Sequence, residues 1–278
     1  MPPLALVGNL SRDVVDGGPP RIGGAPYYAA RAWRVLGSRG TIFTRSGPED
    51  RVAYTRHLTG LGLPVVSLEG TSTTSFSFHY EGDTRIMTVV QAGDTWTPGD
   101  CGVVPPGGWI HVAPLLRSDF PAGTLAVLAR GRHLSLDGQG LVRASETGPL
   151  RLDTDFDPAM LEHVQILKLA EEEAEVVGGI DELGVPEVLV TFGERGSRVY
   201  YKGRSEEVGA WPVAVDPTGS GDAFSAAYLA GRSQGLAPVS AARQATGVVA
   251  ALLTGRLTRP RPSGPHQERT SSTSTARK

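Results

Sequence analysis

The sequence predicts an α/β protein in which a mostly parallel sheet is covered by helices on both faces. Short apolar runs of strand length occur at 41–44, 110–113, 125–129, 134–136, 166–169 and 188–191. Stretches of helical length alternate with them, at 49–60, 174–183 and 239–253. Alternation of this kind favours parallel pairing and a three-layer α/β/α arrangement, because each connecting helix crosses one face of the sheet.

One segment departs from this alternation. From Thr74 to Tyr80, Ser alternates with Phe, and after a Glu-Gly-Asp turn the chain continues as a second extended run from Arg85 to Val90. A period of two residues with a turn between the runs predicts an antiparallel hairpin with one wet face.

Length, charge and cysteine usage exclude several classes of protein. At 278 residues the chain is compatible with a single α/β domain, which we expect over 1–258, followed by a disordered basic tail over 259–278. With 27 Lys and Arg against 29 Asp and Glu, no nucleic-acid footprint appears. Cys101 is the only cysteine, which excludes an intrachain disulfide and fits a reducing cytoplasm. No run approaches the ~18 apolar residues that indicate a membrane span.

The segment from Val215 to Phe224 is the most informative for function. An extended stretch leads into the turn Gly219–Gly221, and Asp222 opens a helix with almost no polar side chain. Unpaired N–H groups at a helix start carry partial positive charge, and small residues let a phosphate approach them. A carboxylate at that place can take a proton from a hydroxyl that attacks a phosphoryl group. A bare Gly-Ser-Gly-Asp string would equally suit an ordinary turn with Asp222 as a helix cap.

The longer string is more specific, because Asp216-Pro217-Thr218-Gly219-Ser220-Gly221-Asp222 resembles the C-terminal signature of the ribokinase-like (PfkB) sugar kinases. In that family the glycine-rich turn is the anion hole and the final Asp is the catalytic base. The resemblance therefore assigns these roles to Gly219, Ser220, Gly221 and Asp222. It also implies a ribokinase-like fold with a small β-lid, a nucleotide contact at Thr218 and a monovalent cation, K⁺, near Asp216 and Thr218.

The N-terminal part is similar to the family at its acceptor site. A first strand over 4–8 is followed by Asp13, and the pair Gly23-Gly24 precedes a helix that ends in Leu-Gly. The resemblance implies that Asp13, Gly23 and Gly24 contact the substrate. Tyr28 stands where the family usually has Asn, so the acceptor is not implied by the resemblance. His111, in an apolar run, is expected either to be satisfied inside the core or to contact the substrate.

Two further segments resemble the nucleotide side of the family's site. The run 166–174 carries Lys168 and Glu173 at positions associated with nucleotide phosphates and with water-bound Mg²⁺, although Ala170 replaces the usual Asn. The alternative for Glu173 is a solvated acidic first turn, which suits the helix dipole. The string from Val188 to Ser197 implies nucleotide contacts that are made by Thr191, Gly193 and Gly196; without the resemblance it would be a plain hairpin.

The lid implied by the resemblance comprises 14–21, which is short here, and 74–90. In many members of the family such strands pair two subunits, so a homodimer through the lid is a further expectation.

Two functions remain from the sequence. The first is a kinase that uses ATP and Mg²⁺ to phosphorylate a hydroxyl of a sugar, polyol or nucleoside. The alternative is a catalytically weak relative that senses a nucleotide or sugar, and the departures at Tyr28 and Ala170 favour it. A dinucleotide-dependent dehydrogenase is excluded, because no Gly-x-Gly-x-x-Gly follows the first strand. The lack of a Gly-x-x-x-x-Gly-Lys string excludes P-loop kinases.

Overall fold

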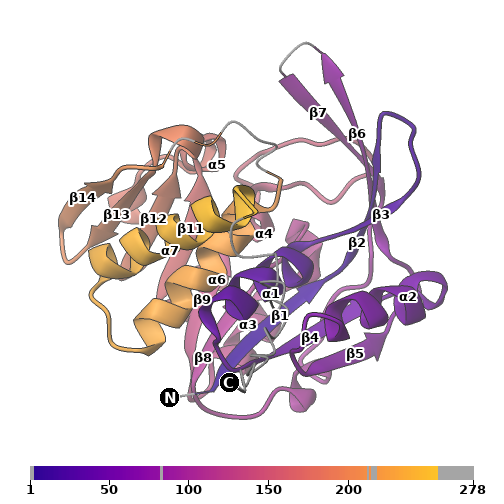
Figure 1. Cartoon of the computed structure of the whole chain (residues 1–278), viewed down its shortest axis with the longest axis horizontal. Helices are drawn as coiled ribbons and strands as arrows, with labels where there is room; N and C mark the ends of the chain where they lie inside the picture. The colour runs from indigo at the N-terminus through magenta and orange to yellow at the C-terminus, as the bar shows by residue number, and fades with distance from the viewer. Residues whose placement is uncertain (1–2, 82–83, 212, 214–217, 256–278) are drawn as a thin grey trace, which may run out of the picture.

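A large twisted sheet forms the centre of the molecule (Figure 1). The computed structural model describes residues 3–81, 84–211, 213 and 218–255. The strands of this sheet are β1 (Leu4–Asn9), β4 (Gly40–Ser46), β5 (Val65–Glu69), β8 (Trp109–Val112), β9 (His133–Asp137), β11 (Ile166–Ala170), β12 (Glu187–Thr191), β13 (Ser197–Tyr201) and β14 (Arg204–Val208). They lie in the order β14-β13-β12-β11-β9-β8-β1-β4-β5. All neighbours from β12 to β5 pair in parallel, whereas β13 and β14 add an antiparallel edge.

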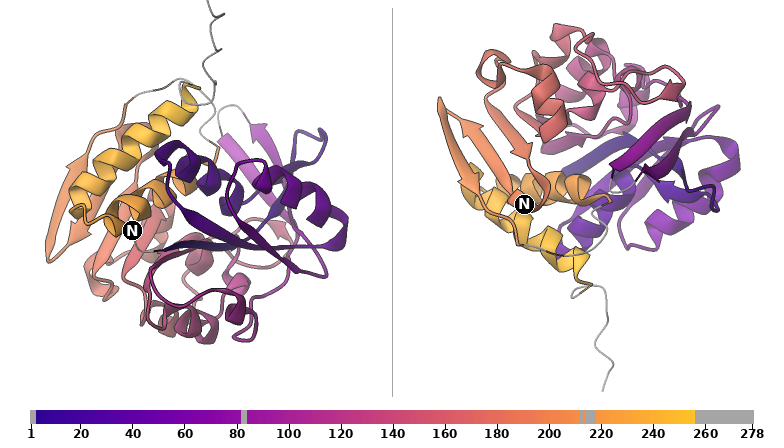
Figure 2. Two further views of the ribbon diagram at one scale, coloured as in Figure 1. Left: turned by 60° about the horizontal axis from the view of Figure 1, so that its bottom comes forward. Right: turned by 90° about the horizontal axis from the view of Figure 1, so that it is seen from above.

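Helices cover both faces of this sheet, as Figure 2 shows in its right view. One layer contains α1 (Ala25–Leu36), α2 (Pro48–Thr59), α6 (Ser220–Ser233) and α7 (Pro238–Leu253). The other contains α3 (Ala122–Ala129), α4 (Gln139–Val142) and α5 (Glu171–Val177). Short 3₁₀ helices occur at Asp100–Val103, Arg117–Asp119, Pro158–Leu161, Ile180–Glu182 and Gly193–Arg195.

Successive side chains of the central strands enter different cores. On β1, Leu6 packs with α1 and α6, while Val7 packs in the core under α3 and α4. On β12, Leu189 and Val190 separate in the same way. Because neighbouring side chains of a strand point to opposite faces, both faces of the sheet are buried. The predicted three-layer architecture is confirmed.

The expectation of a strand at 125–129 is wrong, because these residues belong to α3. Leu125 and Leu128 are both buried in the same core, as residues three apart on one helix face would be. A short apolar run has no period that separates a buried strand from a buried helix. The predicted helix 174–183 is also shorter, since α5 ends at Val177 and Gly178 has φ 66°.

A second, five-stranded sheet carries the predicted hairpin. Its strands are β2 (Ser11–Val15), β3 (Arg21–Gly23), β6 (Thr74–Glu81), β7 (Thr84–Gln91) and β10 (Gly148–Pro149), in the order β10-β7-β6-β2-β3. The strands β6 and β7 pair antiparallel, as the sequence predicts, and extend beyond the central sheet in Figure 1. Phe76 and Phe78 pack with Leu115 and Leu116, which gives this sheet its one apolar face.

The topology brings the carboxyl ends of several parallel strands to one edge of the central sheet. β1 ends at Asn9, β9 at Asp137, β11 at Ala170 and β12 at Thr191. Ligands of open α/β sheets bind outside such an edge. The predicted tail, 259–278, lies outside the described residues. Among the helices that the structure describes, none has the length and apolarity needed to cross a bilayer.

We predict that Trp33→Ala destabilises the fold strongly, because Trp33 is fully buried between α1 and α6 and its indole N–H donates to Ala226 O at 2.9 Å. The expected loss is about 3–5 kcal/mol of unfolding free energy, measured by urea denaturation followed by circular dichroism. Trp211→Ala is the matched control, because Trp211 is 69% exposed; its expected change is within about 0.5 kcal/mol. Similar losses for the two variants would contradict the packing described.

Candidate active site

The turn before α6 adopts the conformation that an anion site needs. Gly219 has φ 77°, a left-handed conformation that favours glycine, and any Cβ at this position would overlap the ring of Tyr28. A Cβ at Gly221 would lie 3.3 Å from the Lys168 ammonium nitrogen. From Ala223 to Gly231 every residue of α6 is buried, as predicted. The unpaired N–H groups of the first turn of α6 therefore lie at the end of a rigid, buried helix.

A cavity of about 180 Å³ lies in front of this turn, between the central sheet and the lid; we call it the acceptor cavity. Its walls are Ser11, Asp13, Gly24, Ala25, Tyr28, Phe76, Phe78, Met87, Leu115, Gln139, Arg143, Lys168, Ala170, Glu172, Glu173, Thr218, Gly219, Gly221 and Asp222. The structure thus brings Asp13, Gly24 and Tyr28, from the N-terminal part of the chain, to a single cavity with the distant Asp222.

Asp13 is held in place from two sides. The Ser11 hydroxyl donates a hydrogen bond of 2.7 Å to Asp13 Oδ1. Gly23 lies against the same carboxylate, and any Cβ at this position would overlap Asp13 Oδ2. Gly24, with φ 92°, then starts α1. Gly23 therefore lets the lid strand β3 pass close to the Asp13 carboxylate, and Gly24 lets the chain before α1 pass close to the backbone of Asn9, Leu10 and Ser11.

Asp222 has the environment of a base rather than of a simple cap. Its Oδ1 is enclosed and accepts no hydrogen bond from the residues that the structure describes. Burial and then the negative charge of Asp137 raise the pKa of Asp222 to about 7, against the opposing effect of Lys168 and Arg143. A carboxylate with a pKa near neutrality is well matched to general-base catalysis.

Asp137 and Lys168 form a buried ion pair beneath the turn. Lys168 Nζ lies 3.5 Å from Asp137 Oδ2, and the two residues are register partners on β9 and β11. Burial disfavours the ammonium ion, but the carboxylates of Asp137, Glu173 and Asp222 raise the pKa of Lys168, so it stays protonated. The pair places a fixed positive charge close to Gly221.

Sequence reasoning missed Asp137, Gln139 and Arg143. The available signal was a polar segment that follows the buried strand 134–136, since the carboxyl ends of parallel strands meet at the ligand-binding edge. Gln139 and Arg143 line the acceptor cavity, and Asp137 lies beside it as the partner of Lys168.

Glu173 is a buried side chain, unlike its two neighbours in the first turn of α5. It is 2% exposed, and its Oε2 accepts a hydrogen bond of 2.8 Å from the Ala170 N–H. Burial raises its pKa, and Lys168 opposes that shift. Glu171 instead pairs with Arg195 at the surface, and Glu172 is exposed. The solvated-face interpretation therefore fits Glu172 but not Glu173.

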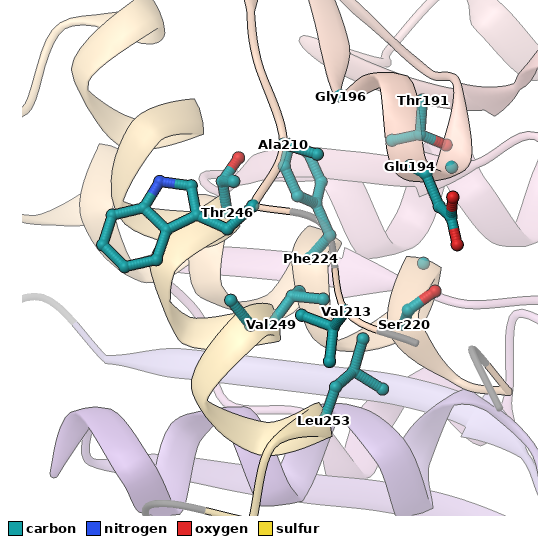
Figure 3. Close-up of a pocket in the computed structure, with 14 residues that line it drawn as sticks. Thr191, Glu194, Gly196, Ala210, Val213, Ser220, Phe224, Thr246, Val249 and Leu253 are labelled. Carbon is teal, nitrogen blue, oxygen red and sulfur yellow. The ribbon is translucent and has the colours of Figure 1, made fainter. Parts of the chain in front are cut away.

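A second cavity, of about 220 Å³, lies between the loop after β12 and helix α7 (Figure 3); we call it the donor cavity. It is lined by Thr191, Gly193, Glu194, Gly196, Ala210, Trp211, Val213, Ser220, Gly221, Phe224, Thr246, Val249, Ala250 and Leu253. In Figure 3 the oxygens of Thr191, Glu194 and Ser220 lie on one side, and Val213, Val249 and Leu253 on another. Gly221 lines both cavities, so the two cavities meet at the first turn of α6.

The other predicted site residues divide between these two cavities and the core. Lys168 and Thr218 line the acceptor cavity, whereas Thr191, Gly193 and Gly196 line the donor cavity. His111 is buried on β8, where its Nδ1 lies 3.1 Å from Ser135 Oγ. It is not among the described residues that line either cavity. Asp216 lies outside the described residues.

The carboxylates at the acceptor cavity fit a magnesium ion that is held mainly by phosphate and water. In the part of the chain that the structure describes, no three His, Cys, Asp or Glu side chains form a metal-binding group. Mg²⁺ does not need such a cage, because it usually keeps several waters and uses one or two carboxylates together with substrate phosphates. Glu173 lines the cavity and could hold the ion through one of these waters.

Comparisons with known proteins identify relatives of this chain among kinases. A fructokinase from Klebsiella pneumoniae is 27% identical over 292 residues, which cover 91% of this chain and 94% of that protein. An inositol 3-kinase from Zea mays is 36% identical over 116 residues, but the match spans only 40% of this chain and 31% of the maize protein.

A solved pyrophosphate-dependent kinase of the ribokinase family, in complex with a pyrophosphate analog and myo-inositol, superposes with a TM-score of 0.79. It is 27% identical, and the match covers 90% of this chain and 95% of that one. A nucleoside kinase from Burkholderia thailandensis, at 21% identity and a TM-score of 0.72, shares the fold.

The family model described as pfkB family carbohydrate kinase matches residues 21–262, which include the lid strands β3, β6, β7 and β10, the donor cavity and the turn before α6. The chain therefore belongs to the pfkB family of carbohydrate kinases.

Proposed function

We propose that this protein is an ATP-dependent kinase that phosphorylates a hydroxyl of a small sugar, polyol or nucleoside. The observation that carries the proposal is the carboxylate of Asp222. It has an oxygen without a hydrogen-bond partner among the described residues and lies where the acceptor and donor cavities meet at the first turn of α6.

In the proposed reaction the acceptor hydroxyl transfers its proton to Asp222 while its oxygen forms a bond to the γ-phosphorus of ATP. The bond from that phosphorus to the bridging oxygen breaks, and ADP leaves. Backbone N–H groups of the turn Gly219–Gly221 and the Lys168 ammonium stabilise the negative charge that develops on the transferred group. Mg²⁺, when bound, neutralises charge on the nucleotide phosphates.

The choice of ATP as donor rests on the lining of the donor cavity. Its walls include Val213, Phe224, Val249 and Leu253, whose apolar surfaces suit a nucleobase and have no counterpart in pyrophosphate. Among the described residues that line it, the only charged one is Glu194. The other lining groups are uncharged, which suits a neutral adenine ring better than an anion such as pyrophosphate. A nucleoside triphosphate is therefore the donor that this cavity favours.

The acceptor cavity suits a small polyhydroxylated molecule. Asp13, Ser11 and Gln139 supply hydrogen-bonding groups on one part of the wall, and Phe76 and Phe78 supply apolar surface from the lid. With a volume of about 180 Å³, the cavity is better matched to one sugar or polyol ring than to a nucleoside. Because relatives include an inositol 3-kinase and a fructokinase, myo-inositol and fructose are the first acceptors to test.

We expect Asp222→Asn to retain ATP binding but to lose turnover by about 10²–10⁴-fold, because the amide keeps the shape of the side chain and cannot accept the proton. The measurement is ADP release with a panel of sugars, polyols and nucleosides, alongside ATP binding by calorimetry. Parent-level turnover in the folded variant would leave Asp222 as a helix cap. If the unsubstituted protein binds ATP but turns over no acceptor, the alternative function is favoured, in which a catalytically weak relative senses a nucleotide or sugar.

The pH dependence of the unsubstituted enzyme should show the titration of Asp222. Because only the carboxylate accepts a proton, kcat/KM for the acceptor should rise with pH through about 7, the pKa of Asp222. Asp137→Asn removes a negative charge that raises this pKa, so its profile should shift to lower pH. The profiles are measured with ATP and Mg²⁺ saturating. An unshifted profile in Asp137→Asn would exclude Asp222 as the titrating group.

The donor assignment predicts that adenosine competes with the donor and that ATP supports turnover better than pyrophosphate. Thr246→Trp should fill the donor cavity and raise the KM for ATP by about tenfold or more, the effect of losing about 1.4 kcal/mol of binding. Thr59→Trp is the matched control, because both threonine hydroxyls bond a carbonyl of their own helix and Thr59 is exposed on α2. Turnover with pyrophosphate that adenosine does not inhibit would overturn the assignment.

A further inference from the structure

Arg143 is a positively charged residue at the acceptor cavity, and the proposed reaction gives it no role. It follows α4 directly, and its side chain is 17% exposed, so it is largely enclosed by the walls. Of the described residues that line this cavity, only Arg143 and Lys168 are basic. Lys168 is already engaged with Asp137 beneath the turn.

The guanidinium of Arg143 differs from those of the half-buried Arg117 and Arg132. Its recorded contact is an ion pair of 3.9 Å with Glu173 Oε1, and the described residues accept no hydrogen bond from it. Arg117, by contrast, donates to Leu141 O at 2.7 Å and pairs with Asp153. Arg132 donates to three backbone carbonyls. A guanidinium has five N–H donors, so those of Arg143 remain available to a ligand in the cavity.

The backbone that carries Arg143 is firmly held, so the side chain starts from a fixed point. The Arg143 N–H donates to Gln139 O at 3.1 Å, and Arg143 O accepts from the Arg117 N–H at 3.0 Å. An isolated antiparallel β-bridge between Arg143 and Leu152 holds this backbone from a second side. The Arg117 guanidinium in turn binds the carbonyls of the residues just before Arg143. This arrangement holds the backbone at Arg143, while its guanidinium donates no hydrogen bond to the described residues.

The charges at the cavity indicate what such a group would bind. Asp13, Glu172, Glu173 and Asp222 bring four carboxylates to the walls, against the two cations. A phosphoryl group that enters beside Asp222 adds further negative charge, and repulsion from these carboxylates would oppose its transfer. A planar guanidinium can donate two parallel hydrogen bonds to phosphate oxygens, which an ammonium ion cannot do.

We infer that Arg143 is a phosphate-binding residue of this site, whose guanidinium contacts the phosphoryl group as it passes from the donor to the acceptor hydroxyl. Arg143 and Ala170 both line the acceptor cavity, and Arg143 supplies hydrogen-bond donors that the methyl group of Ala170 cannot. This inference rests on the proposed kinase function and adds a specific residue to it.

A purely structural role is the competing explanation, in which Arg143 only neutralises the buried Glu173. The two explanations differ in a double-substitution test. If Arg143 acts only through Glu173, Glu173→Gln and the double variant should show the same loss of turnover as Arg143→Gln. If Arg143 contacts the phosphoryl group, Arg143→Gln should lower kcat further in the Glu173→Gln background.

The kinetic experiment compares Arg143→Gln, Arg143→Lys and Arg151→Gln in the full chain. Arg143→Gln should lower kcat by about 10²–10³-fold with little change in the KM for ATP, as expected when one charge-stabilising donor is lost in the transition state. Arg143→Lys keeps the positive charge but loses the paired N–H donors of the guanidinium, so its kcat should lie between those of Arg143→Gln and the parent. Arg151 is 66% exposed and pairs with Glu146, so Arg151→Gln should retain parent activity. A kcat for Arg143→Gln within about twofold of the parent would overturn the inference.

Binding of inorganic phosphate gives a test that does not depend on turnover. Titration followed by ³¹P NMR should show that Arg143→Gln weakens phosphate binding by about fivefold or more, which corresponds to the loss of one charge-assisted hydrogen bond. Arg151→Gln should bind as the parent does. Equal binding in all three proteins, or no binding by the parent at millimolar phosphate, would contradict the inference. Absence of kinase turnover alone would refute the proposed function and leave this titration interpretable.

Discussion

The buried position of helix α6 is the constraint on which the site depends. Every residue from Ala223 to Gly231 is buried, so the helix axis and its first turn are fixed by packing against α1 and α7. The unpaired N–H groups of that turn therefore point at a constant place, the junction of the acceptor and donor cavities. Tyr28 on α1 lies directly against Gly219 and reinforces this placement. An anion site made of backbone needs such support, because it has no side chain that could adjust its position.

A group of charged side chains around Asp222 is the second feature on which the site depends. Asp137, Lys168, Glu173 and Arg143 all influence its pKa, and most of them are held at the ends of β9 and β11 or at the start of α5. Ionised groups are stable at such depth only when each has an opposite charge or a hydrogen bond. The Asp137–Lys168 pair and the bond from Ala170 N–H to Glu173 meet this requirement. Asp222 retains an oxygen without a protein partner among the described residues, and so remains able to accept a proton.

The linings of the two cavities differ, and each suits one substrate of the proposed reaction. Apolar side chains of α7 and of the segment before α6 form one part of the donor cavity, which suits a nucleobase in the proposed reaction. The acceptor cavity mixes carboxylate, hydroxyl and amide groups with the lid's phenylalanines, which favours a molecule with many hydroxyls and some apolar surface. Family membership alone does not decide the donor, because a related solved structure is pyrophosphate-dependent. The proposal that ATP is the donor rests on the apolar side chains that line the donor cavity.

The sequence by itself determined the parallel sheet with helices on both faces, the antiparallel hairpin and the turn Gly219–Gly221 with Asp222, because each depends on short-range periodicity or on a contiguous motif. It did not distinguish helix from strand at 125–129, where a short apolar run has no diagnostic period. Only the tertiary structure decided that Glu173 is buried, that His111 belongs to the core, and that Asp137 and Arg143 join the site. These outcomes depend on which strand ends become neighbours. Strand order is set by packing over the whole chain, and no local pattern around Asp137 or Arg143 records that Lys168 and Asp222 will lie beside them.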